Sequence, residues 1–278
     1  MRIVPVVKMS GSGNDFLMID NGKGQLSSKE LVKLAKSACP RRISAGADGL
    51  IVIEKAVQPG HAYRMRILNA DGSEAEMCGN GSRCVAVFAN HLGVAGLTQT
   101  IETLAGTLHA TASEDGRSAK VQLSPPNSME IKAAVEVLGK STELCFINTG
   151  VPHAVEFVDD VSQVDLKARG AAIRYHEAFK PQGTNANFVQ LLGGQAIKLR
   201  TYERGVEDET LACGTGATAS AICTALRHAY APPINIHVAS GDVLTIHFQL
   251  DQAQKSTQAP PFLEGPVKTV YKGEYYWE

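Results

Sequence analysis

The 278-residue sequence has no excess of either charge and no long apolar run. Lysine and arginine together number 27, and aspartate and glutamate number 28, which gives a formal net charge of −1. Proteins that bind nucleic acids or membrane surfaces rely on a basic excess, so this balance argues against both partners. No apolar stretch approaches the roughly 18 residues that a membrane-spanning helix needs. The first residues lack the zones of a secretory signal peptide, which predicts a cytoplasmic protein.

Cysteine is scarce, and no two cysteines have the Cys-x-x-Cys spacing. Six cysteines in a chain of this length do not make a disulfide scaffold. The missing spacing argues against a structural zinc site and against a protein of thiol–disulfide exchange. Each cysteine therefore needs its own explanation. For Cys39, Cys84, Cys145 and Cys223 we favour the role of a small buried apolar side chain.

The chain contains one internal repeat. The segments at Cys78 and Cys213 both read Cys-Gly-x-Gly, and their positions differ by 213 − 78 = 135 residues. A period this long indicates two domains of like fold and not a solenoid. Four further pairs of segments align in the same order at nearly the same offset: 64–67 with 198–201, 46–51 with 183–189, 13–18 with 152–157, and 103–108 with 238–244.

We place the two domains at residues 1–124 and 125–264, and we expect the segment of about 265–278 to pack back on the first. The boundary falls at Pro125-Pro126, in a linker-like stretch over 124–128. The polar stretch 251–261 is typical of a loop, and 267–277 is strand-like.

Each half has the same predicted order of elements, with strands around a central helix. Ser27-x-x-Glu30 is a capping box that starts a helix over 28–38, and a weaker helical pattern occupies about 160–174. The central helices are predicted over 82–92, with Gly93 as C-cap, and over 217–230. Both are apolar nearly all round, which is typical of a buried helix. A hairpin is predicted from strands 234–238 and 243–248.

The Cys-Gly-x-Gly turn before each central helix has a chemical use. The first turn of a helix carries unpaired N–H groups and a partial positive charge. Glycine allows an anion to approach these groups closely, and the same field stabilises a nearby thiolate. The motif can therefore hold a carboxylate beside a sulfur with a lowered pKa.

Two such motifs in paired domains would bring Cys78 and Cys213 to the cleft between them. Acid/base groups on opposite sides of one carbon invert a stereocentre. One thiolate removes the α-proton, and the opposite thiol delivers a proton to the other face. Helix N-termini would stabilise the charge that develops on the substrate carboxylate. No lysine lies in an obvious setting for pyridoxal phosphate, so we expect chemistry without a cofactor.

The motifs together resemble the diaminopimelate epimerase family, nearly end to end. The resemblance rests on six segments: 8–16 (KMSGSGNDF), 69–74 (NADGSE), 77–83 (MCGNGSR), 148–153 (NTGVPH), 183–188 (GTNANF) and 202–216, which contains Glu203-Arg204-Gly205 and the second cysteine motif. It implies an isomerase that interconverts LL- and meso-2,6-diaminopimelate, a small-molecule substrate, in lysine and peptidoglycan synthesis. It also implies an α+β fold of two pseudo-symmetric, duplicated domains. Each would be a curved, mostly antiparallel sheet or barrel around a central helix, with the active site in the interdomain cleft.

The resemblance also implies residue roles. Cys78 and Cys213 would be the catalytic thiols, and His153 and Glu203 would tune their pKa values. No residue is expected to bind a metal. The residues implied in substrate binding are Asn14, Asn69, Gly79, Asn80, Asn185, Glu203, Arg204, Gly214 and Thr215. Chemically this set suits a substrate with two ammonium and two carboxylate groups, because a guanidinium grips a carboxylate and a carboxylate accepts from an ammonium.

Two positions depart from some members of the family, and three other functions stay open. Gly49 stands where some members have Gln, and Val151 where some have Asn. The nearest alternative is an epimerase or racemase of the same fold that acts on proline or hydroxyproline. A redox protein and a non-catalytic anion-binding module are the others. A homodimer is one possible assembly, which the sequence does not decide.

Overall fold

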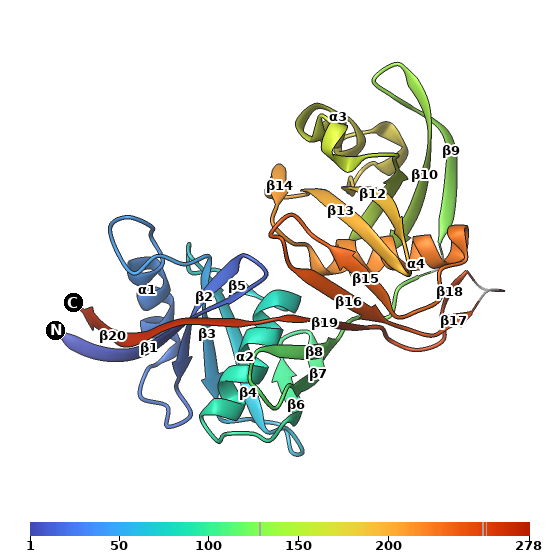
Figure 1. Ribbon diagram of the computed structural model, residues 1–278. Helices are drawn as coiled ribbons and strands as arrows, with labels where there is room; N and C mark the ends of the chain where they lie inside the picture. The colour runs from blue at the N-terminus through green and yellow to red at the C-terminus, as the bar shows by residue number, and fades with distance from the viewer. Residues whose placement is uncertain (128, 252, 254) are drawn as a thin grey trace. The chain divides into compact units, whose positions relative to one another are not determined.

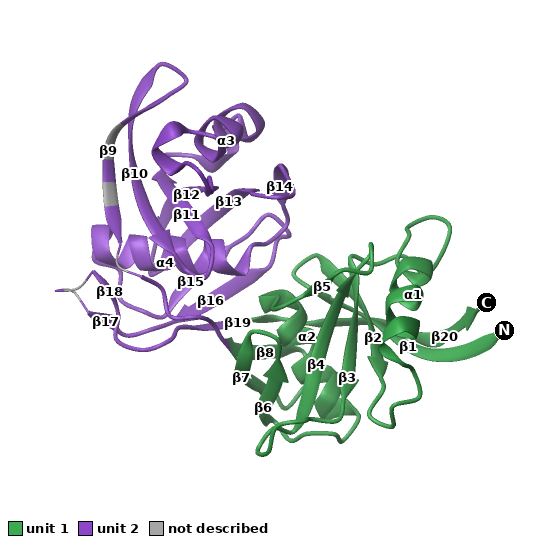
Figure 2. Ribbon diagram, turned by 180° about the vertical axis from the view of Figure 1, so that it is seen from behind, with its two compact units in different colours: residues 1–121, 265–278 green, residues 122–264 purple. Residues whose placement is uncertain are grey.

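The computed structural model of the chain describes residues 1–127, 129–251, 253 and 255–278. It divides into two compact units, one of residues 1–121 with 265–278 and one of residues 122–264 (Figure 2). We call them unit 1 and unit 2. In the described part of the chain, no helix is both long and apolar enough to cross a membrane.

Unit 1 is a mostly antiparallel sheet with a helix on each face (Figure 1). Hydrogen bonding places its strands in the order β20-β1-β2-β3-β4-β6-β7-β8, and the short β5 also pairs with β4. Only the β2–β3 and β4–β6 pairs are parallel. The elements are β1 (Arg2–Gly11), β2 (Asn14–Asp20), α1 (Ser28–Ala38), β3 (Gly49–Glu54), β4 (Tyr63–Asn69), β5 (Glu74–Ala75), α2 (Gly79–His91), β6 (Thr98–Thr103), β7 (Gly106–Ala112), β8 (Ser118–Gln122) and β20 (Lys268–Trp277).

Unit 2 repeats this topology. Its strands follow the order β9-β10-β11-β12-β13-β15-β16-β19, with the short β14 also paired to β13. The parallel pairs, β11–β12 and β13–β15, fall at the same two places as in unit 1. The elements are β9 (Glu130–Val137), β10 (Lys140–Asn148), β11 (Pro152–Phe157), α3 (Leu166–Arg174), β12 (Asn185–Gly193), β13 (Ala196–Glu203), β14 (Asp208–Thr210), α4 (Gly214–His228), β15 (Ile234–His237), β16 (Val243–His247), β17 (Leu250–Asp251), β18 (Ser256–Thr257) and β19 (Phe262–Pro266).

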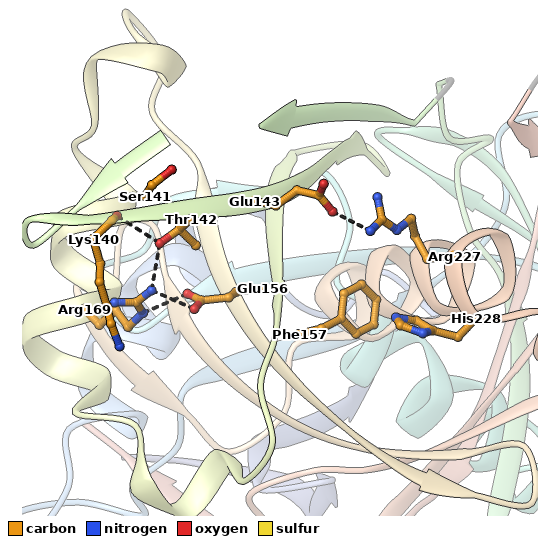
Figure 3. Close-up of a pocket in the computed structure, with 9 residues that line it drawn as sticks. All are labelled: Lys140, Ser141, Thr142, Glu143, Glu156, Phe157, Arg169, Arg227 and His228. Carbon is orange, nitrogen blue, oxygen red and sulfur yellow. Dashed lines mark hydrogen bonds and ion pairs between the residues drawn. The ribbon is translucent and has the colours of Figure 1, made fainter. Parts of the chain in front are cut away.

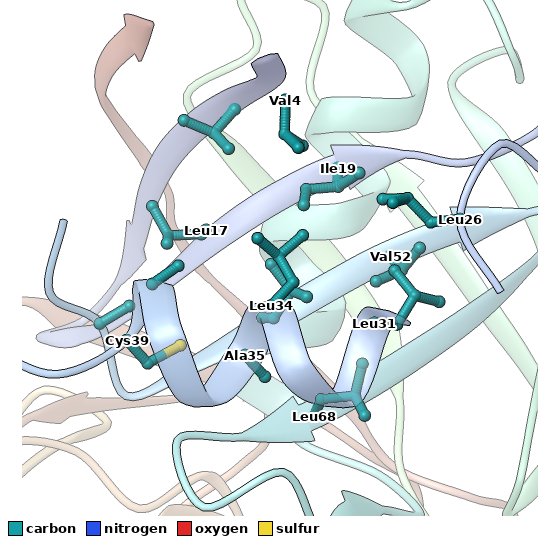
Figure 4. Packing of buried hydrophobic residues seen from close by; sticks show 14 residues of the cluster. Val4, Leu17, Ile19, Leu26, Leu31, Leu34, Ala35, Cys39, Val52 and Leu68 are labelled. Carbon is teal, nitrogen blue, oxygen red and sulfur yellow. The ribbon is translucent and has the colours of Figure 1, made fainter. Parts of the chain in front are cut away.

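The sheet of unit 1 is apolar on both faces because its strands alternate toward two helices. Leu17 and Ile19 of β2 join the cluster that holds Leu31 and Leu34 of α1 (Figure 4). Phe16 lies on the other face, close to Gly81 in the first turn of α2. Burying a leucine side chain contributes about 1.5–3 kcal/mol, so these contacts fix the sheet between its two helices. In unit 2 the cluster that includes Leu166 and Ile173 packs α3 on its sheet, and α4 contacts that sheet at β11, β12 and β13.

The structure confirms most of the predicted elements. Helix α1 has the predicted bounds, and its capping box is formed by Ser27 and Glu30. The predicted hairpin is β15–β16. The α+β class, with sheets that are mostly antiparallel, is also confirmed.

The bounds of several other elements were predicted wrongly. Both central helices begin three residues earlier than predicted, because Cys78 and Cys213 are themselves the N-cap residues. Leu92, and not Gly93, is the C-cap of α2, while α4 ends at His228.

Two predicted segments are interrupted by other structure. The predicted helix of about 160–174 divides into a 3₁₀ turn over Val161–Gln163 and α3. The stretch 251–261, predicted as a loop, contains a short ladder between β17 and β18. Residue 128 of the predicted linker and residues 252 and 254 of this stretch lie outside the described residues.

Candidate active site

Each duplicated unit carries a cysteine at the N-cap of its central helix. The Cys78 sulfur accepts a hydrogen bond from the Gly81 N–H at 3.5 Å, and the Cys213 sulfur accepts one from the Gly216 N–H at 3.4 Å. An N-cap side chain satisfies an amide that the helix leaves unpaired, and the helix dipole favours negative charge there. No acidic residue occupies the first turn of either helix. At both sulfurs the start of the helix therefore contributes a field that favours the thiolate.

The surroundings of Cys78 in unit 1 include a fixed asparagine. The Cys78 thiol donates to Asn14 Oδ1 at 3.4 Å, and Asn14 Nδ2 donates to Asp48 Oδ2 at 2.6 Å. Arg41 pairs with Asp48 at 2.7 Å and with Asp15. Although burial opposes ionisation of Asp15, hydrogen bonds from Arg41 and Lys8 lower its pKa to about 2. This charged network holds the Asn14 amide with its oxygen toward the sulfur.

The other residues predicted in unit 1 lie on two elements. Gly79 and Asn80 open helix α2, and the Asn80 side chain is buried. Asn69 ends β4, is exposed, and donates from Nδ2 to Ser73 Oγ at 2.9 Å. Its backbone partner across the β3–β4 ladder is Gly49. A Cβ added to Gly49 would lie 2.7 Å from the Leu68 carbonyl oxygen, so the backbone of this chain has no room there for a larger residue.

The surroundings of Cys213 in unit 2 favour the thiol over the thiolate. Burial, and then the carboxylate of Glu203, raise the pKa of Cys213 to about 12. Hydrogen bonds from the Gly216 amide and the Thr215 hydroxyl oppose this shift, with Sγ and the Thr215 Oγ1 3.4 Å apart. Burial also raises the pKa of the Glu203 carboxyl. The Glu203 carboxylate thus disfavours ionisation of Cys213, while the hydrogen bond with Cys213 lowers the pKa of Glu203 against the effect of burial.

Three further predicted residues of unit 2 lie around the start of β12. Asn185 is buried, donates to the Pro152 carbonyl at 2.9 Å and accepts the Arg204 backbone N–H at 2.8 Å. It therefore fixes the loop that carries Arg204. The Arg204 guanidinium donates to the Gln182 carbonyl at 3.0 Å. His153 is wholly buried, and burial lowers its pKa to about 3.

Several polar residues that were not predicted from the sequence form hydrogen bonds with the predicted site residues. Asp48 fixes Asn14 in unit 1. In unit 2, Thr149 Oγ1 donates to the Thr215 carbonyl at 3.0 Å, and Asn187 lies 3.1 Å from the His153 ring. One signal for Asn187 is its position, because residues two apart on a strand share a face and Asn185 is a predicted site residue.

A surface pocket of unit 2 contains none of the predicted site residues (Figure 3). Its lining includes Arg169 and Arg227, and both guanidinium groups already pair with carboxylates. Arg169 binds Glu156 at 2.7 Å, and Arg227 forms an ion pair with Glu143. Neither arginine therefore offers an open charge to an anionic ligand.

Comparison with known proteins identifies the family. The family model for diaminopimelate epimerase matches residues 6–129 and 145–262. A diaminopimelate epimerase of Aquifex aeolicus is 46% identical over 275 residues, covering 96% of this chain and 95% of the relative. One of Hydrogenobaculum sp. is 42% identical over 283 residues, covering 98% and 99%.

Solved structures of other enzymes share the fold. A PhzF-family phenazine biosynthesis protein of Bacillus anthracis superposes with a TM-score of 0.74 at 15% identity, covering all of both chains. A probable proline racemase of Agrobacterium radiobacter gives a TM-score of 0.70 at 16% identity, covering 99% of this chain and 93% of that one. At such identities the likeness concerns the fold alone. The family model and the two sequence relatives cover nearly the whole chain, so the protein belongs to the diaminopimelate epimerase family.

Proposed function

We propose that the protein interconverts LL- and meso-2,6-diaminopimelate without a metal or cofactor. The observation that carries the proposal is the pair of cysteine N-caps. Each duplicated unit has one sulfur that accepts an amide hydrogen bond at the start of a buried helix. The relatives that match nearly the full chain are named for this substrate, which supports the choice of reaction.

The proposed reaction uses Cys78 and Cys213 from opposite faces of the substrate α-carbon. The thiolate takes the α-proton, so the C–H bond breaks, an S–H bond forms, and the electron pair moves toward the carboxylate. The thiol on the other face then gives its proton to the carbon, which inverts the stereocentre and leaves a thiolate. The reverse reaction exchanges the two roles. Because burial and Glu203 favour its protonated form, Cys213 is suited to begin as the proton donor.

The carbanion is the difficult species, and the helix starts stabilise it. Gly79 and Asn80 open α2, and Gly214 and Thr215 open α4, so the reacting carboxylate would meet the partial positive charge at the starts of both helices. Proton transfer by positioned side chains accelerates a reaction by about 10²- to 10⁴-fold. Electrostatic stabilisation by fixed dipoles supplies a further share. We also propose that His153 and Glu203 tune the pKa values of the two thiols.

The far end of the substrate carries a second ammonium and a second carboxylate. The guanidinium of Arg204 can bind the carboxylate, and the carboxylate of Glu203 can accept from the ammonium. The amides of Asn14, Asn69 and Asn185 add hydrogen bonds of either sense. Proline has no such charged end, so this residue set favours diaminopimelate over proline or hydroxyproline.

The setting of the enzyme follows from this chemistry. A mechanism that needs one thiolate and one thiol requires a reducing compartment, so we place the activity in the cytoplasm. There it would serve lysine and peptidoglycan synthesis. We also propose a homodimer, because closed twofold assemblies are the commonest oligomers of soluble enzymes.

The test is exchange of the substrate α-hydrogen in deuterium oxide. We expect deuterium to enter LL- and meso-diaminopimelate, as detected by NMR, and proline to remain unlabelled. Label in proline alone would overturn the choice of substrate, and label in none of these amino acids would overturn epimerase function.

Replacement of the sulfurs tests the mechanism. Cys78→Ala and Cys213→Ala should each lower the epimerisation rate by roughly 10²-fold or more, because one of the two proton carriers is lost. Cys223→Ala is the matched control, since Cys223 is buried within α4, ten residues beyond Cys213. It should keep the parent rate. A Cys78→Ala enzyme that still epimerises at that rate would exclude the two-thiol mechanism.

A further inference from the structure

His153 is a buried histidine with one nitrogen bound and the other unused. It lies on β11 and has no exposed surface. Its Nδ1 is 3.1 Å from Asn187 Nδ2, while its Nε2 has no hydrogen-bond partner among the residues that the structure describes. A buried polar group without a partner destabilises the fold because it has lost its hydrogen bonds to water, so an unused nitrogen in the interior needs an explanation.

The Asn187 amide has one stable orientation. Asn187 and Thr201 are both buried. The amide nitrogen also donates to the Ala154 carbonyl at 3.0 Å, and its oxygen accepts from Thr201 Oγ1 at 3.1 Å. A flipped amide would place its oxygen against the Ala154 carbonyl oxygen, where two acceptors repel. The NH₂ group must therefore face His153.

This orientation determines where the imidazole carries its proton. An NH₂ group can only donate, so the facing Nδ1 must accept and cannot be protonated. The proton of the neutral ring is then on Nε2. The bound nitrogen is thus an acceptor, and the unused one is an N–H donor.

Asn187 also contacts the turn that holds the Cys213 sulfur. A Cβ added to Gly216 would lie 2.5 Å from Asn187 Oδ1, so the amide packs directly against this glycine. The Gly216 N–H is the group that donates to Cys213 Sγ. One side chain therefore braces both the histidine ring and the first turn of α4.

We propose that Asn187, held by Thr201, is a positioning residue that fixes His153 as a neutral Nε2–H donor for an anionic group of the reaction. His153 then stabilises negative charge and does not itself carry a proton between groups. The inference rests on the proposed epimerase function, since that reaction supplies the anion: a thiolate or a substrate carboxylate. Burial keeps the ring neutral, because it lowers the pKa of His153 to about 3, and the charge of Arg204 acts in the same direction.

Nitrogen NMR of the full chain tests the tautomer directly. Histidine would be labelled with ¹⁵N, and the His153 signals would be assigned by comparison with His153→Gln. We expect Nε2 to be protonated and Nδ1 to be unprotonated from pH 5 to pH 9. A proton on Nδ1, or a ring that titrates near pH 6.5, would overturn the proposal.

Asn187→Asp reverses the hydrogen bond. A carboxylate accepts from Nδ1–H, so the ring should change to the other tautomer and its pKa should rise. We expect kcat to fall by roughly 10- to 100-fold, as when the group that orients an imidazole is lost. A reversed tautomer with the parent kcat would refute the role, and so would an unchanged tautomer.

Thr201→Val provides a milder variant in case the buried aspartate prevents folding. It removes only the hydroxyl that holds Asn187, so both tautomers should become visible and kcat should fall, while Thr201→Ser should restore both properties. Thr224→Val is the matched control, because Thr224 is also buried in unit 2 but its hydroxyl donates to the Ser220 carbonyl. An equal loss of kcat in Thr201→Val and in Thr224→Val would contradict the proposal.

The two proposals fail in different ways. A parent chain without exchange into diaminopimelate would refute the proposed function, and its ¹⁵N spectrum would still report the tautomer. Conversely, an active epimerase with a proton on His153 Nδ1 would refute only the role of Asn187.

Discussion

Cysteine is a poor choice for capping a helix if stability is the only consideration. Ser, Thr, Asp and Asn are preferred at the N-cap because an oxygen accepts an amide hydrogen bond better than a thiol sulfur does. Cys78 and Cys213 both occupy this position. The sulfur is therefore better explained by chemistry than by capping, since the same N–H group and helix dipole that a cap uses also stabilise a thiolate.

At the scale of one residue, replacing the carboxylate of Glu203 is predicted to change the reactivity of Cys213. Glu203→Gln removes a negative charge beside Cys213, so the pKa of Cys213 should fall from its raised value of about 12. At a fixed pH near 8 the thiolate fraction then rises, and alkylation of Cys213 should become faster. Peptide mass spectrometry after treatment with iodoacetamide measures the rate at this one cysteine.

Glu209→Gln is the control for this experiment. Glu209 lies on β14 of the same unit and pairs with Arg200 at 2.7 Å. Its loss should leave the alkylation rate of Cys213 unchanged. If Glu203→Gln leaves that rate unchanged as well, Glu203 does not set the pKa of the thiol.

Residue types and spacings predicted the two cysteines, but the residues that hold the site were not predictable in this way. Cys78 and Cys213 stand out because the same short motif occurs twice. Asp48 and Asn187 lie within segments that carry the repeat or the family resemblance, but neither residue type nor spacing singles them out. Their roles follow from the β2–β3 and β11–β12 parallel pairs, which place them near Asn14 and His153, more than thirty residues away in the chain.

At the scale of elements, the bounds of the central helices show the limit of apolar periodicity. The pattern predicts the buried faces of α2 and α4 but begins only where apolar side chains begin. Glycines weaken the helix interior, so Gly79 and Gly214 were predicted as turns. They are helical because a cap supplied by the preceding cysteine starts the helix, and this local capping signal is not part of the apolar periodicity.

At this scale, replacing Gly216 in the first turn of α4 is predicted to destabilise the protein. Gly216→Ala would place a methyl group 2.5 Å from Asn187 Oδ1. Because Asn187 is buried and hydrogen-bonded on both sides, it cannot move aside freely. We expect a loss of about 1–3 kcal/mol in the free energy of unfolding, as for other overpacked sites. Urea denaturation followed by circular dichroism measures it.

The comparison variant is Gly96→Ala. Gly96 has no atom within 4 Å of an added Cβ and no positive φ angle. The free energy of unfolding of Gly96→Ala should differ from that of the parent protein by no more than about 1 kcal/mol in either direction. Equal stability of the Gly216→Ala and parent proteins would mean that the contact between Asn187 and α4 is loose.

At the scale of the whole molecule, the duplication extends to strand order. Both sheets have parallel pairs at the same two places, and both place a cysteine N-cap before the helix that packs on them. Local sequence signals predicted the repeat because glycines and strand patterns recur in order. The exact pairing was not predictable, since parallel strands are joined through long connections that carry no local signature of their partner.

A mixing experiment tests whether one chain supplies both sulfurs. The chain passes between the units twice, at residues 121–122 and 264–265. This covalent link keeps Cys78 and Cys213 at a high effective concentration. Cys78→Ala and Cys213→Ala proteins, unfolded together and refolded as a mixture, should therefore show no more activity than either variant alone.

The alternative is a site assembled from Cys78 of one chain and Cys213 of another. In randomly formed dimers, half the molecules would then pair the two variants and each would carry one intact site, which restores about a quarter of the parent activity. Parent protein refolded in the same way controls for losses during refolding. Recovery near a quarter would refute the single-chain mechanism, because covalent linkage of the duplicated units would then have no part in bringing the two sulfurs to one substrate.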